Sequence, residues 1–413
     1  MTGTPADRLQ SLDLVRGVAV MGILLLNIVS FGLPDGAYFN PRAYGGSDGA
    51  DLATYLINFV FFDGRMRGLF SFLFGASMLL VIERAEAKGE NPAQIHYRRM
   101  AWLLAFGLAH LWLVWDGDIL AHYALVGMLA YLLRKLPVPR LLALGAVLVI
   151  FETFLLGGLP FGVYMLEHVP EGSARAAQAA RQLAGFNHDF GIPGTAELAK
   201  DLQIHRGGYA GILAERLHAN RLGPLNLLLV YGMETLAYMV FGMAALRSGL
   251  LRGEWSRADY RKWLVIGFGI GVPAYAALAA YMIGQDFSLF SVTLAVMALA
   301  TPVRPLMILG WACLILLLAR PGGALTGRIA AAGRMAFTNY LATSLICTTF
   351  FYGYGLGWYG HLSRSALYLV VLGVWGLMLL WSKPWLARYR YGPLEWLWRT
   401  LARGSLQPMR RAS

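Results

Sequence analysis

The stretch RLQSLDLVRGVAVMGILLLNIVSFGLP, from Arg8 to Pro34, has the length and hydrophobicity of a helix that crosses a membrane. It nevertheless carries Asp13 and Arg16 near its start and Asn27 inside it, and charges and amides are costly in lipid. A helical residue turns about 100° and rises about 1.5 Å, so Arg16 and Asn27 fall within roughly 20° of each other and about 16 Å apart. Asp13 lies on nearly the same side. The stretch therefore predicts a helix with one polar stripe that faces other helices or a water-filled cavity.

This polar stripe has two interpretations. In the first, Asp13 and Arg16 form an i, i+3 ion pair that anchors the helix at the membrane interface. Asn27 then makes a hydrogen bond to another helix, as amides often do between membrane helices. In the second interpretation, the three side chains line a path for a polar ligand. The sequence alone leaves both open.

The composition extends the membrane prediction to the whole chain. Of 413 residues, 57% are hydrophobic and 14% are charged, and the mean hydropathy is +0.54. An ordinary soluble domain is about 45–50% apolar and about 25% charged. We therefore predict an all-α, polytopic helical membrane protein. The net charge of +12 does not indicate nucleic-acid binding, because no basic segment is interleaved with base-stacking aromatic residues.

Apolar segments recur along the chain and predict about ten membrane-spanning helices. The expected spans are residues 14–33, 67–83, 100–115, 119–134, 139–160, 225–246, 262–283, 304–319, 329–351 and 365–382. Residues 1–413 are predicted to form a single membrane domain, with an extracytoplasmic helical insertion at 166–223 and a basic cytoplasmic tail at 388–413. The apolar segment 286–303 is short for a span, so we predict a re-entrant or interfacial piece there.

The charges of the loops predict the topology. Lys and Arg gather in the C-terminal tail and in alternate loops, around residues 84–99, 134–140, 247–262 and 320–334, whereas 116–118 and 284–303 contain none. Cytoplasmic loops of membrane proteins are enriched in Lys and Arg. We therefore expect an N-in, C-in topology, with the insertion on the outer side.

The segment FGLAHLWLVWDGDILAHYALVG, residues 106–127, concentrates His110, Asp116, Asp118 and His122 around one turn. A histidine beside a carboxylate can act as a general base that the carboxylate orients. His110, His122 and Asp118 are therefore the catalytic candidates. The structural alternative is that both histidines are satisfied core residues and that Asp118 caps the following helix. No helical pair of histidines has metal-ligand spacing, so no metal site is predicted.

Two further segments carry candidate binding residues. In FFDGRMRGLFSFLFGAS, residues 61–77, Arg65 and Arg67 lie at the outer mouth of a span and could bind an anionic group or lipid headgroups. In GRMAFTNYLATSLICTTFFYGYGLGWYG, Arg334 lies near the inner end of a span and Asn339 begins a polar face of that helix.

The C-terminal segment YGPLEWLWRTLARG, residues 391–404, predicts an amphipathic helix on the inner surface. Pro393 is suited to its first turn, and Glu395 and Arg399 have the spacing of an i, i+4 pair. The two cysteines, Cys313 and Cys347, both lie in apolar segments, so a disulfide scaffold is not expected.

Five motifs of this chain resemble those of the YeiB-like family, also called domain of unknown function 418. They are SLDLVRGVAVMGILLLNIVSF, FFDGRMRGLFSFLFGAS, GDILAHYALVG, GRMAFTNYLATSLICTTFFYGYGLG and YGPLEWLWR. The resemblance covers nearly the whole chain except the insertion. The LDxxRG motif at the start is also similar to the opening of multi-span membrane acyltransferases, which include the heparan glucosaminide acetyltransferase and the bacterial acyltransferase-three proteins.

This wider resemblance implies an acyl-CoA donor held from the cytosolic side and an acceptor reached from the other face. Arg16 and Asn27 match positions of the shared pattern, and with Arg334 they are the candidates for donor binding. The candidates for substrate binding are Arg65, Arg67 and Asn339. The resemblance also implies a multi-pass protein of the bacterial cytoplasmic (inner) membrane, and a homodimer.

The chain departs from the heparan acetyltransferase in one respect. That enzyme has a histidine in its first outer loop, whereas residues 28–66 contain none here and the first histidine is His96. An acyl-histidine intermediate in that loop is therefore not expected. His110 or His122 would instead act as a general base in direct transfer.

Three functions compete at this stage. The first is a membrane acyltransferase acting on a small-molecule or glycan acceptor, with acyl-CoA as donor and no metal. The second is a small-solute transporter or permease, because intramembrane polar residues also fit a solute path. The third is a non-enzymatic membrane scaffold whose basic tail contacts lipid. A tunnel that reaches His110 from both faces would favour the first, and a solid bundle would favour the third.

Overall fold

The structure, a computed structural model, describes residues 5–219 and 222–411. Residues 220–221 of the expected insertion and 412–413 of the expected tail lie outside the described part. Within it the chain forms helices and connecting segments, with one isolated bridge between Tyr389 and Arg410, so the all-α prediction is confirmed. The elements are α1 (Pro5–Gly32), η1 (Asp35–Tyr38), α2 (Gly49–Phe61), α3 (Arg65–Ala87), α4 (Pro92–Leu113), α5 (Leu120–Ala130), η2 (Tyr131–Leu133), α6 (Val138–Glu167), α7 (Ala176–Phe190), α8 (Thr195–His205), α9 (Tyr209–Ala219), α10 (Gly223–Arg247), α11 (Arg257–Gly284), α12 (Leu289–Thr293), η3 (Leu294–Leu299), α13 (Arg304–Leu318), α14 (Ala324–Arg334), α15 (Ala336–Phe351), α16 (Leu367–Arg388) and α17 (Pro393–Arg403).

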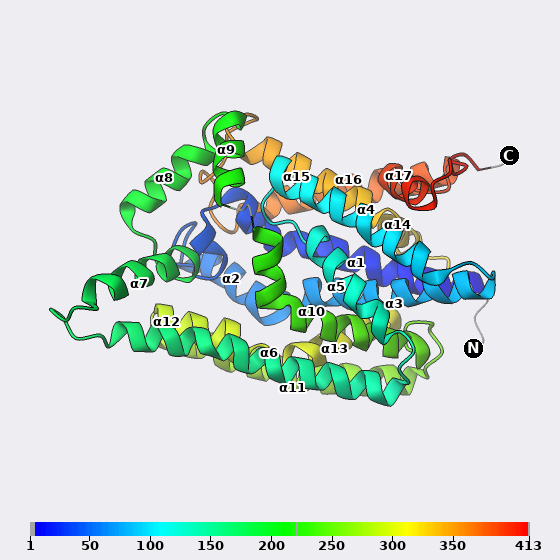
Figure 1. The fold of residues 1–413 in the computed structure, drawn as a ribbon, viewed down its shortest axis with the longest axis horizontal. Helices are drawn as coiled ribbons and strands as arrows, with labels where there is room; N and C mark the ends of the chain where they lie inside the picture. Colours follow the sequence, from blue (N-terminus) through cyan, green and yellow to red (C-terminus); the bar gives the residue numbers. More distant parts are fainter. Residues whose placement is uncertain (1–4, 220–221, 412–413) are drawn as a thin grey trace.

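The long helices run side by side, and the two ends of the bundle differ (Figure 1). The beginning of α1 and the C-terminal α17 lie at one end, here called the termini end. The insertion helices α7, α8 and α9 lie at the opposite end, here called the insertion end. Because the beginning of α1 and α17 lie at the same end, the arrangement agrees with an even number of membrane crossings. That the termini end faces the cytoplasm stays a prediction from the loop charges.

Six described helical segments are long and apolar enough to cross a membrane, or seven if one bent pair counts as a span. The six are Gln10–Gly32, Gly49–Ala87, Val138–Glu167, Gly223–Arg247, Arg257–Gly284 and Leu367–Arg388. The expected count of about ten is not confirmed. The span expected at 100–115 lies in α4, whose first turns are charged, and 119–134 forms only the short α5 and η2. The span expected at 329–351 is divided at Met335 into α14 and α15.

The segment expected to be re-entrant forms α12 and η3. It follows a tight turn in which Asp286 and Phe287 both have φ of 52°. Leu289–Leu299 and Arg304–Leu318 then meet at 62°, the geometry of a broken span or a re-entrant loop. A broken span has the same geometry, so the re-entrant or interfacial piece at 286–303 stays a prediction.

Two glycines allow close contacts between neighbouring helices. A Cβ on Gly333 of α14 would lie 1.9 Å from the Asp13 carbonyl oxygen of α1. A Cβ on Gly242 of α10 would lie 1.7 Å from the Phe72 carbonyl oxygen of α3. Small residues permit such approach between membrane helices. The first contact brings the end of α14, and with it Arg334, beside the polar start of α1.

The core has two main apolar parts. One is built chiefly by α3, α10 and α13 and contains Cys313, and the other is built by α1, α15 and α16 and contains Cys347. Both cysteines are buried and free. Between these parts, α4 and α5 pack against each other and carry the His/Asp motif.

Candidate functional site

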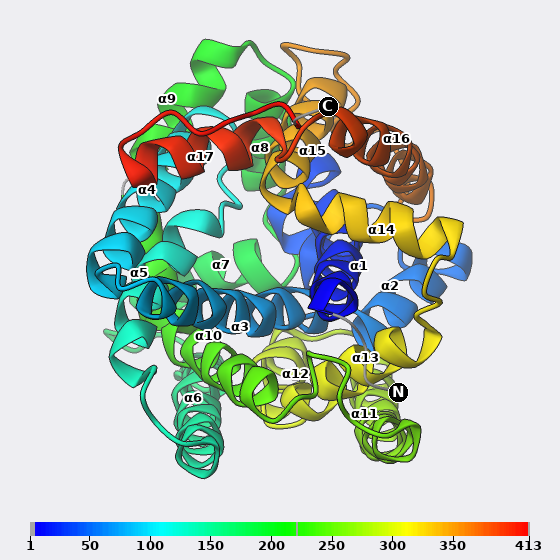
Figure 2. The same cartoon turned by 90° about the vertical axis from the view of Figure 1, so that its right-hand side faces the viewer.

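A cavity of about 410 Å³ enters the bundle from the termini end, and we name it the basic cavity. Its lining side chains come from α1, α3, α4, α5, α15 and α17 and from the end of α14. In Figure 2 the first six of these helices surround the centre of the view. Six guanidinium groups line it, those of Arg16, Arg84, Arg99, Arg334, Arg390 and Arg399. Only two carboxylates join them, those of Asp13 and Glu395. The cavity is therefore suited to a ligand with several negative charges.

The two carboxylates are already engaged within the protein. Asp13 Oδ1 lies 3.0 Å from Arg16 Nη1, so the predicted ion pair is confirmed. Arg16 also donates through Nη2 to Ser77 Oγ at 2.7 Å. Glu395 accepts from the backbone N–H groups of Phe337 and Thr338 at the start of α15. Within residues 5–219 and 222–411, none of the other five arginines forms an ion pair, so their charge is available to a ligand.

The C-terminal helix α17 closes one side of the basic cavity. Trp398 donates from Nε1 to the Arg99 carbonyl oxygen at 2.9 Å, and the Arg99 guanidinium lies 4.1 Å from the centre of the Trp398 ring. The expected i, i+4 pair of Glu395 and Arg399 does not form. Glu395 caps α15 instead, and Arg399 makes a cation–π contact with the Tyr391 ring. A smaller pocket of about 150 Å³ continues outward from the same arginines. It shares Arg84, Arg99 and Arg399 with the basic cavity and adds Lys88 and Arg403.

His110 and Asp118 form a buried pair. His110 Nδ1 lies 2.8 Å from Asp118 Oδ1, and the two residues are 2% and 5% exposed. Since a carboxylate only accepts, Nδ1 donates in this hydrogen bond, and in the neutral form of the ring Nε2 holds the lone pair. Asp118 Oδ2 also accepts from the Ala121 N–H at 2.8 Å, so the predicted cap of α5 is confirmed. His110 Nε2 is buried without a hydrogen-bond partner in the described chain.

The pair lies just beyond the apolar end of the basic cavity. Tyr340 and Leu120 line that end, and the Tyr340 ring lies 5.4 Å from the His110 ring. Asp116, on the same turn as Asp118, lines a second cavity at the insertion end. His110 itself lines neither cavity, and the two cavities share no lining residue. The pair thus separates two cavities that approach it from opposite ends, and no continuous tunnel joins them among the described residues.

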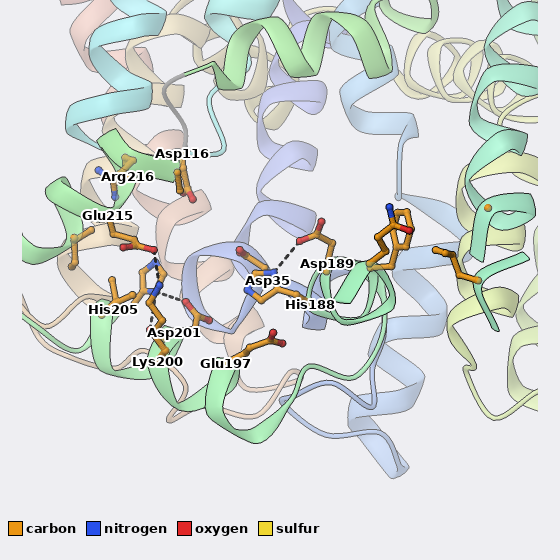
Figure 3. Close-up of a pocket in the computed structure, with 18 of the residues that line it drawn as sticks. Asp35, Asp116, His188, Asp189, Glu197, Lys200, Asp201, His205, Glu215 and Arg216 are labelled. Carbon is orange, nitrogen blue, oxygen red and sulfur yellow. Dashed lines mark hydrogen bonds and ion pairs between the residues drawn. The ribbon is translucent and has the colours of Figure 1, made fainter. Parts of the chain in front are cut away.

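The second cavity, here named the insertion cavity, has a volume of about 990 Å³. Figure 3 shows charged side chains from η1, the turn after α4, and α7, α8 and α9 arranged around it. Three pairs form inside it, His205–Asp201 at 2.7 Å, His188–Asp189 at 2.9 Å and Lys200–Glu215 at 3.1 Å. The sequence of this region predicted a helical insertion but gave no sign of its cavity.

Burial and neighbouring charges shift three pKa values in this cavity. Desolvation by the cavity walls, together with the carboxylates of Asp116 and Asp201, raises the pKa of Asp35 to about 7, although the residue is exposed and His205 and His188 oppose this shift. A hydrogen bond to the Asp189 carboxylate raises the pKa of His188 to about 9, against burial, which lowers it. Burial lowers the pKa of His205, but the Asp201 carboxylate outweighs it and the net shift is upward. Near neutral pH the cavity therefore holds a cationic His188 and a carboxyl, that of Asp35, which exchanges its proton readily.

The remaining predicted catalytic residue, His122, lies apart from both cavities. Its Nε2 lies 2.8 Å from Thr235 Oγ1 of α10, and its Nδ1 is buried without a partner in the described chain. It is thus in a different part of the bundle from the His110–Asp118 pair. Asn27 is half-buried in α1 and does not line the basic cavity.

The candidates for substrate binding are engaged with the protein. Arg65 is fully buried and donates to the carbonyl oxygens of Phe59, Val60 and Asp63 at the end of α2. Arg67 pairs with the buried Glu234 at 2.6 Å.

Asn339 donates to the Ala332 carbonyl and Ser382 Oγ and accepts from Trp381. It therefore holds α14, α15 and α16 together. Like Arg65 and Arg67, it lines neither the basic nor the insertion cavity.

Several residues at the candidate site were not predicted. Arg84, Arg99 and Arg390 were counted only as charges that set the topology, and Arg399 only as such a charge and as a partner of Glu395. A signal was present, because basic residues predicted to lie at the same end of a helical bundle can gather around a common space. Within residues 5–219 and 222–411, no group of three or more His, Cys, Asp or Glu side chains is arranged to hold a metal ion.

The fold and the apolar helices define a multi-pass helical membrane protein with a cationic cavity at one end. A family described as "Protein of unknown function (DUF418)" matches residues 245–405. The chain is 33% identical to the uncharacterized protein YeiB of Escherichia coli strain K12, over 96% of each chain. It is 32% identical to the uncharacterized protein YxaH of Bacillus subtilis strain 168, over 98% of this chain and 96% of that one. The chain therefore belongs to the YeiB-like DUF418 family, as its motifs predicted.

Proposed function

We propose that the protein is a membrane acyltransferase. It takes an acyl group from acyl-CoA bound at the termini end and passes it to an acceptor bound at the insertion end. The observation that carries this proposal is the buried His110–Asp118 pair, whose free Nε2 lies between a cationic cavity and a second polar cavity. The proposal places the protein in the bacterial cytoplasmic membrane with its termini end in the cytosol.

The basic cavity suits the donor at both of its ends. Coenzyme A carries a diphosphate and a further phosphate, and guanidinium groups bind phosphate strongly. Arg16 and Arg334, the donor candidates from the sequence, lie there with four more arginines. The deep end is lined by Leu103, Leu120 and Phe337, which suit an acyl chain.

His110 acts as the general base in this proposal. Its Nε2 removes the proton of the acceptor nucleophile as that atom attacks the thioester carbonyl carbon. The bond from carbonyl carbon to sulfur breaks, and His110 returns the proton to the sulfur, so the products are the acylated acceptor and the free thiol. Asp118 fixes the ring orientation through Nδ1–H and stabilises the imidazolium that forms. Since Tyr340 stands between His110 and the basic cavity, its side chain must turn aside for the thioester to reach Nε2.

The donor half of the proposal is tested by binding. Purified protein in lipid nanodiscs is titrated with acetyl-CoA by calorimetry. Removing one of several phosphate-binding arginines is expected to weaken binding by about tenfold, so we choose Arg334→Ala, whose side chain makes only one protein hydrogen bond. Arg257→Ala is the matched control, because this exposed arginine at the same end lines no described cavity. Absence of acetyl-CoA binding to the wild type refutes the proposal.

The catalytic half is tested by transfer of radioactive acetyl groups. Loss of a general base costs about 10²–10⁴ in rate, so His110→Gln is expected to lower kcat by at least about 100-fold while acetyl-CoA binding is kept. Asp118→Asn is expected to lower kcat and to shift the pH profile of kcat. The substitution removes the carboxylate that orients the His110 ring and stabilises its protonated form. His168→Gln, at an exposed histidine after α6, is the control. Equal rates for His110→Gln and the wild type rule out the general-base role.

A transporter is the second candidate, because two cavities that end at a common barrier and a helix pair bent by 62° also fit alternating access. Uptake of a labelled solute into proteoliposomes that is independent of His110 would favour it. Acetyl transfer that disappears with His110→Gln would favour the enzyme.

A further inference from the structure

The small pocket beside the basic cavity, here named the outer pocket, is lined mainly by cations. It lies where the end of α3, the start of α4 and the helix α17 meet, and its volume is about 150 Å³. Of the described residues that line it, one carries a carboxylate, Glu90, and five carry a cation, namely Arg84, Lys88, Arg99, Arg399 and Arg403. A ligand of the outer pocket is therefore expected to bring negative charge.

The protein itself neutralises little of this positive charge. Glu90 Oε1 lies 3.5 Å from Arg403 Nη1, and the other four cations of the outer pocket have no ion-pair partner in the part of the chain that the structure describes. Arg399 Nε is buried without a hydrogen-bond partner there. A buried donor without a partner costs free energy, so an acceptor that binds at this donor is stabilising.

The cations also repel one another, which is a second observation that points to an anion. Desolvation lowers the pKa of Arg99 to about 10, and the charges of Arg399 and Arg403 add to this shift. The Arg99 guanidinium is held in place, because it lies 4.1 Å from the centre of the Trp398 ring. An anion that binds among these groups offsets their repulsion and stabilises their charged forms.

The size of the outer pocket limits the group that it can hold. A pocket for a whole small molecule has a volume of about 300–1,000 Å³, so a volume of about 150 Å³ suits one compact group. A phosphomonoester is compact, carries about −1.5 to −2 charge near neutral pH and presents three acceptor oxygens. Guanidinium groups bind such oxygens two at a time. A carboxylate brings one charge and two oxygens, so it would leave more of the cations unmatched.

The outer pocket adjoins the basic cavity. Arg84, Arg99 and Arg399 line both spaces. In Figure 2 α17 lies beside α4, and the hydrogen bond from Trp398 Nε1 to the Arg99 carbonyl oxygen joins these two helices. One ligand can therefore place an anionic group in each space, with the shared arginines between them. In coenzyme A a single ribose carries both the diphosphate and the phosphomonoester, so these two groups are close enough for adjoining sites.

We propose that the outer pocket binds the 3′-phosphate of acyl-CoA and thereby selects this donor against thioesters that lack a phosphomonoester. This inference rests on the proposed acyltransferase function and adds a specificity site to it. Lys88 and Arg403 line the outer pocket but not the basic cavity, so they are the residues that determine this specificity. The headgroup of phosphatidic acid is another source of a phosphomonoester, and the experiment separates the two sources.

The test compares acetyl-CoA with 3′-dephospho-acetyl-CoA by calorimetry, with the full-length protein in phosphatidylcholine nanodiscs. Both ligands keep the thioester and the diphosphate, so only the phosphomonoester differs. We expect the wild type to bind acetyl-CoA about tenfold more tightly, because hydrogen bonds between charged groups are about twice as strong as neutral ones. Lys88→Glu is expected to bring the two dissociation constants within about twofold of each other. Lys88→Gln, which removes the charge without reversing it, should lower their ratio by about threefold.

Arg98→Glu is the matched control. It makes the same change of charge at an exposed residue of α4 that lines neither the outer pocket nor the basic cavity. The ratio of the two dissociation constants should therefore stay within about twofold of the wild-type ratio. A general loss of positive potential weakens the binding of both ligands, because both carry the diphosphate, whereas loss of the outer pocket weakens only acetyl-CoA.

The outcomes separate the specificity site from the function on which it rests. Equal affinity of the wild type for the two ligands would overturn the inference, and so would a wild-type ratio in both Lys88 variants. A second arm adds phosphatidic acid to the nanodiscs and measures its retention by native mass spectrometry. Equal affinity for the two donors, with phosphatidic acid kept by the wild type and lost from Lys88→Glu, would assign the outer pocket to a lipid headgroup. Failure of both donors to bind the wild type would instead refute the proposed function itself.

Discussion

Removal of the Glu395 carboxylate should loosen the helix that closes the basic cavity. Glu395 lies on α17 but serves α15, because its Oε1 accepts from the Phe337 N–H at 2.8 Å and the Thr338 N–H at 3.0 Å. Its Oε2 accepts from the Thr338 hydroxyl, which in turn accepts from the Leu394 N–H at 3.1 Å. One residue thus caps the first turn of a helix 57 positions away in sequence and joins it to α17.

The magnitude follows from the groups that Glu395→Ala leaves unpaired. A buried donor without a partner costs about 1–3 kcal/mol, and two backbone N–H groups are orphaned here. We expect about 3 kcal/mol in total, more than the roughly 0.5–2 kcal/mol lost with an ordinary helix cap, because two donors lose their acceptor. Burial raises the pKa of Glu395, although hydrogen bonds from Thr338 and Phe337 oppose the shift. Glu395→Gln should cost only about 1 kcal/mol because it keeps one acceptor oxygen.

The assay is reversible unfolding in mixed micelles, followed by tryptophan fluorescence. Glu86→Ala removes an exposed glutamate of α3 near the same end and should stay within about 0.5 kcal/mol of wild type. If Glu395→Ala also stays within that range, the remote cap has no energetic weight and the reasoning is wrong. If Glu395→Gln costs as much as Glu395→Ala, the charge rather than the acceptor geometry is what α15 requires.

Three further predictions concern stability and titration. Since the pKa of Asp35 rises to about 7 on folding, its ionisation opposes folding, so thermal stability should fall as pH rises from about 4 to about 8, and Asp35→Asn should remove part of that fall. The pKa of His188, raised to about 9, should drop toward its ordinary value of about 6.5 in Asp189→Asn, as followed by NMR of labelled histidine; an unchanged value would exclude the Asp189 hydrogen bond as cause. Gly242→Ala should cost about 1–3 kcal/mol because the new Cβ meets the α3 backbone, whereas Gly269→Ala, with open space around it, should not destabilise.

The sequence predicted best those features that depend on neighbours along one helix. The Asp13–Arg16 pair and the Asp118 cap follow from spacings of three residues, and both are present. The number of spans was harder to predict. The hydropathy of a segment indicates whether it suits a membrane, but not whether it forms one straight helix across it. The division at Met335 illustrates this, since residues on both sides of it are apolar enough for one continuous helix.

The candidate site was predicted only in part, because it is made by distant contacts. Glu395 and Arg399 have the spacing of an ion pair, but the start of α15 offers Glu395 better hydrogen-bond donors and Tyr391 offers Arg399 a ring. Arg65 looked like a ligand-binding cation at a helix mouth. It instead satisfies the carbonyl groups at the end of α2, a need that no sequence pattern reveals.

In the proposed reaction, the turn from Trp115 to Ile119 would link the two cavities. Trp115 stacks on Phe31 and so fixes the turn to the end of α1. Asp116 then faces the insertion cavity, while Asp118, two residues later, holds His110 and caps α5. In the proposed reaction, an acceptor in the insertion cavity would lie beside Asp116, which a segment of three residues joins to Asp118 and so to His110. Transfer between ligands that enter from opposite ends requires this kind of fixed geometry, because a small displacement of either reacting group lowers the rate steeply.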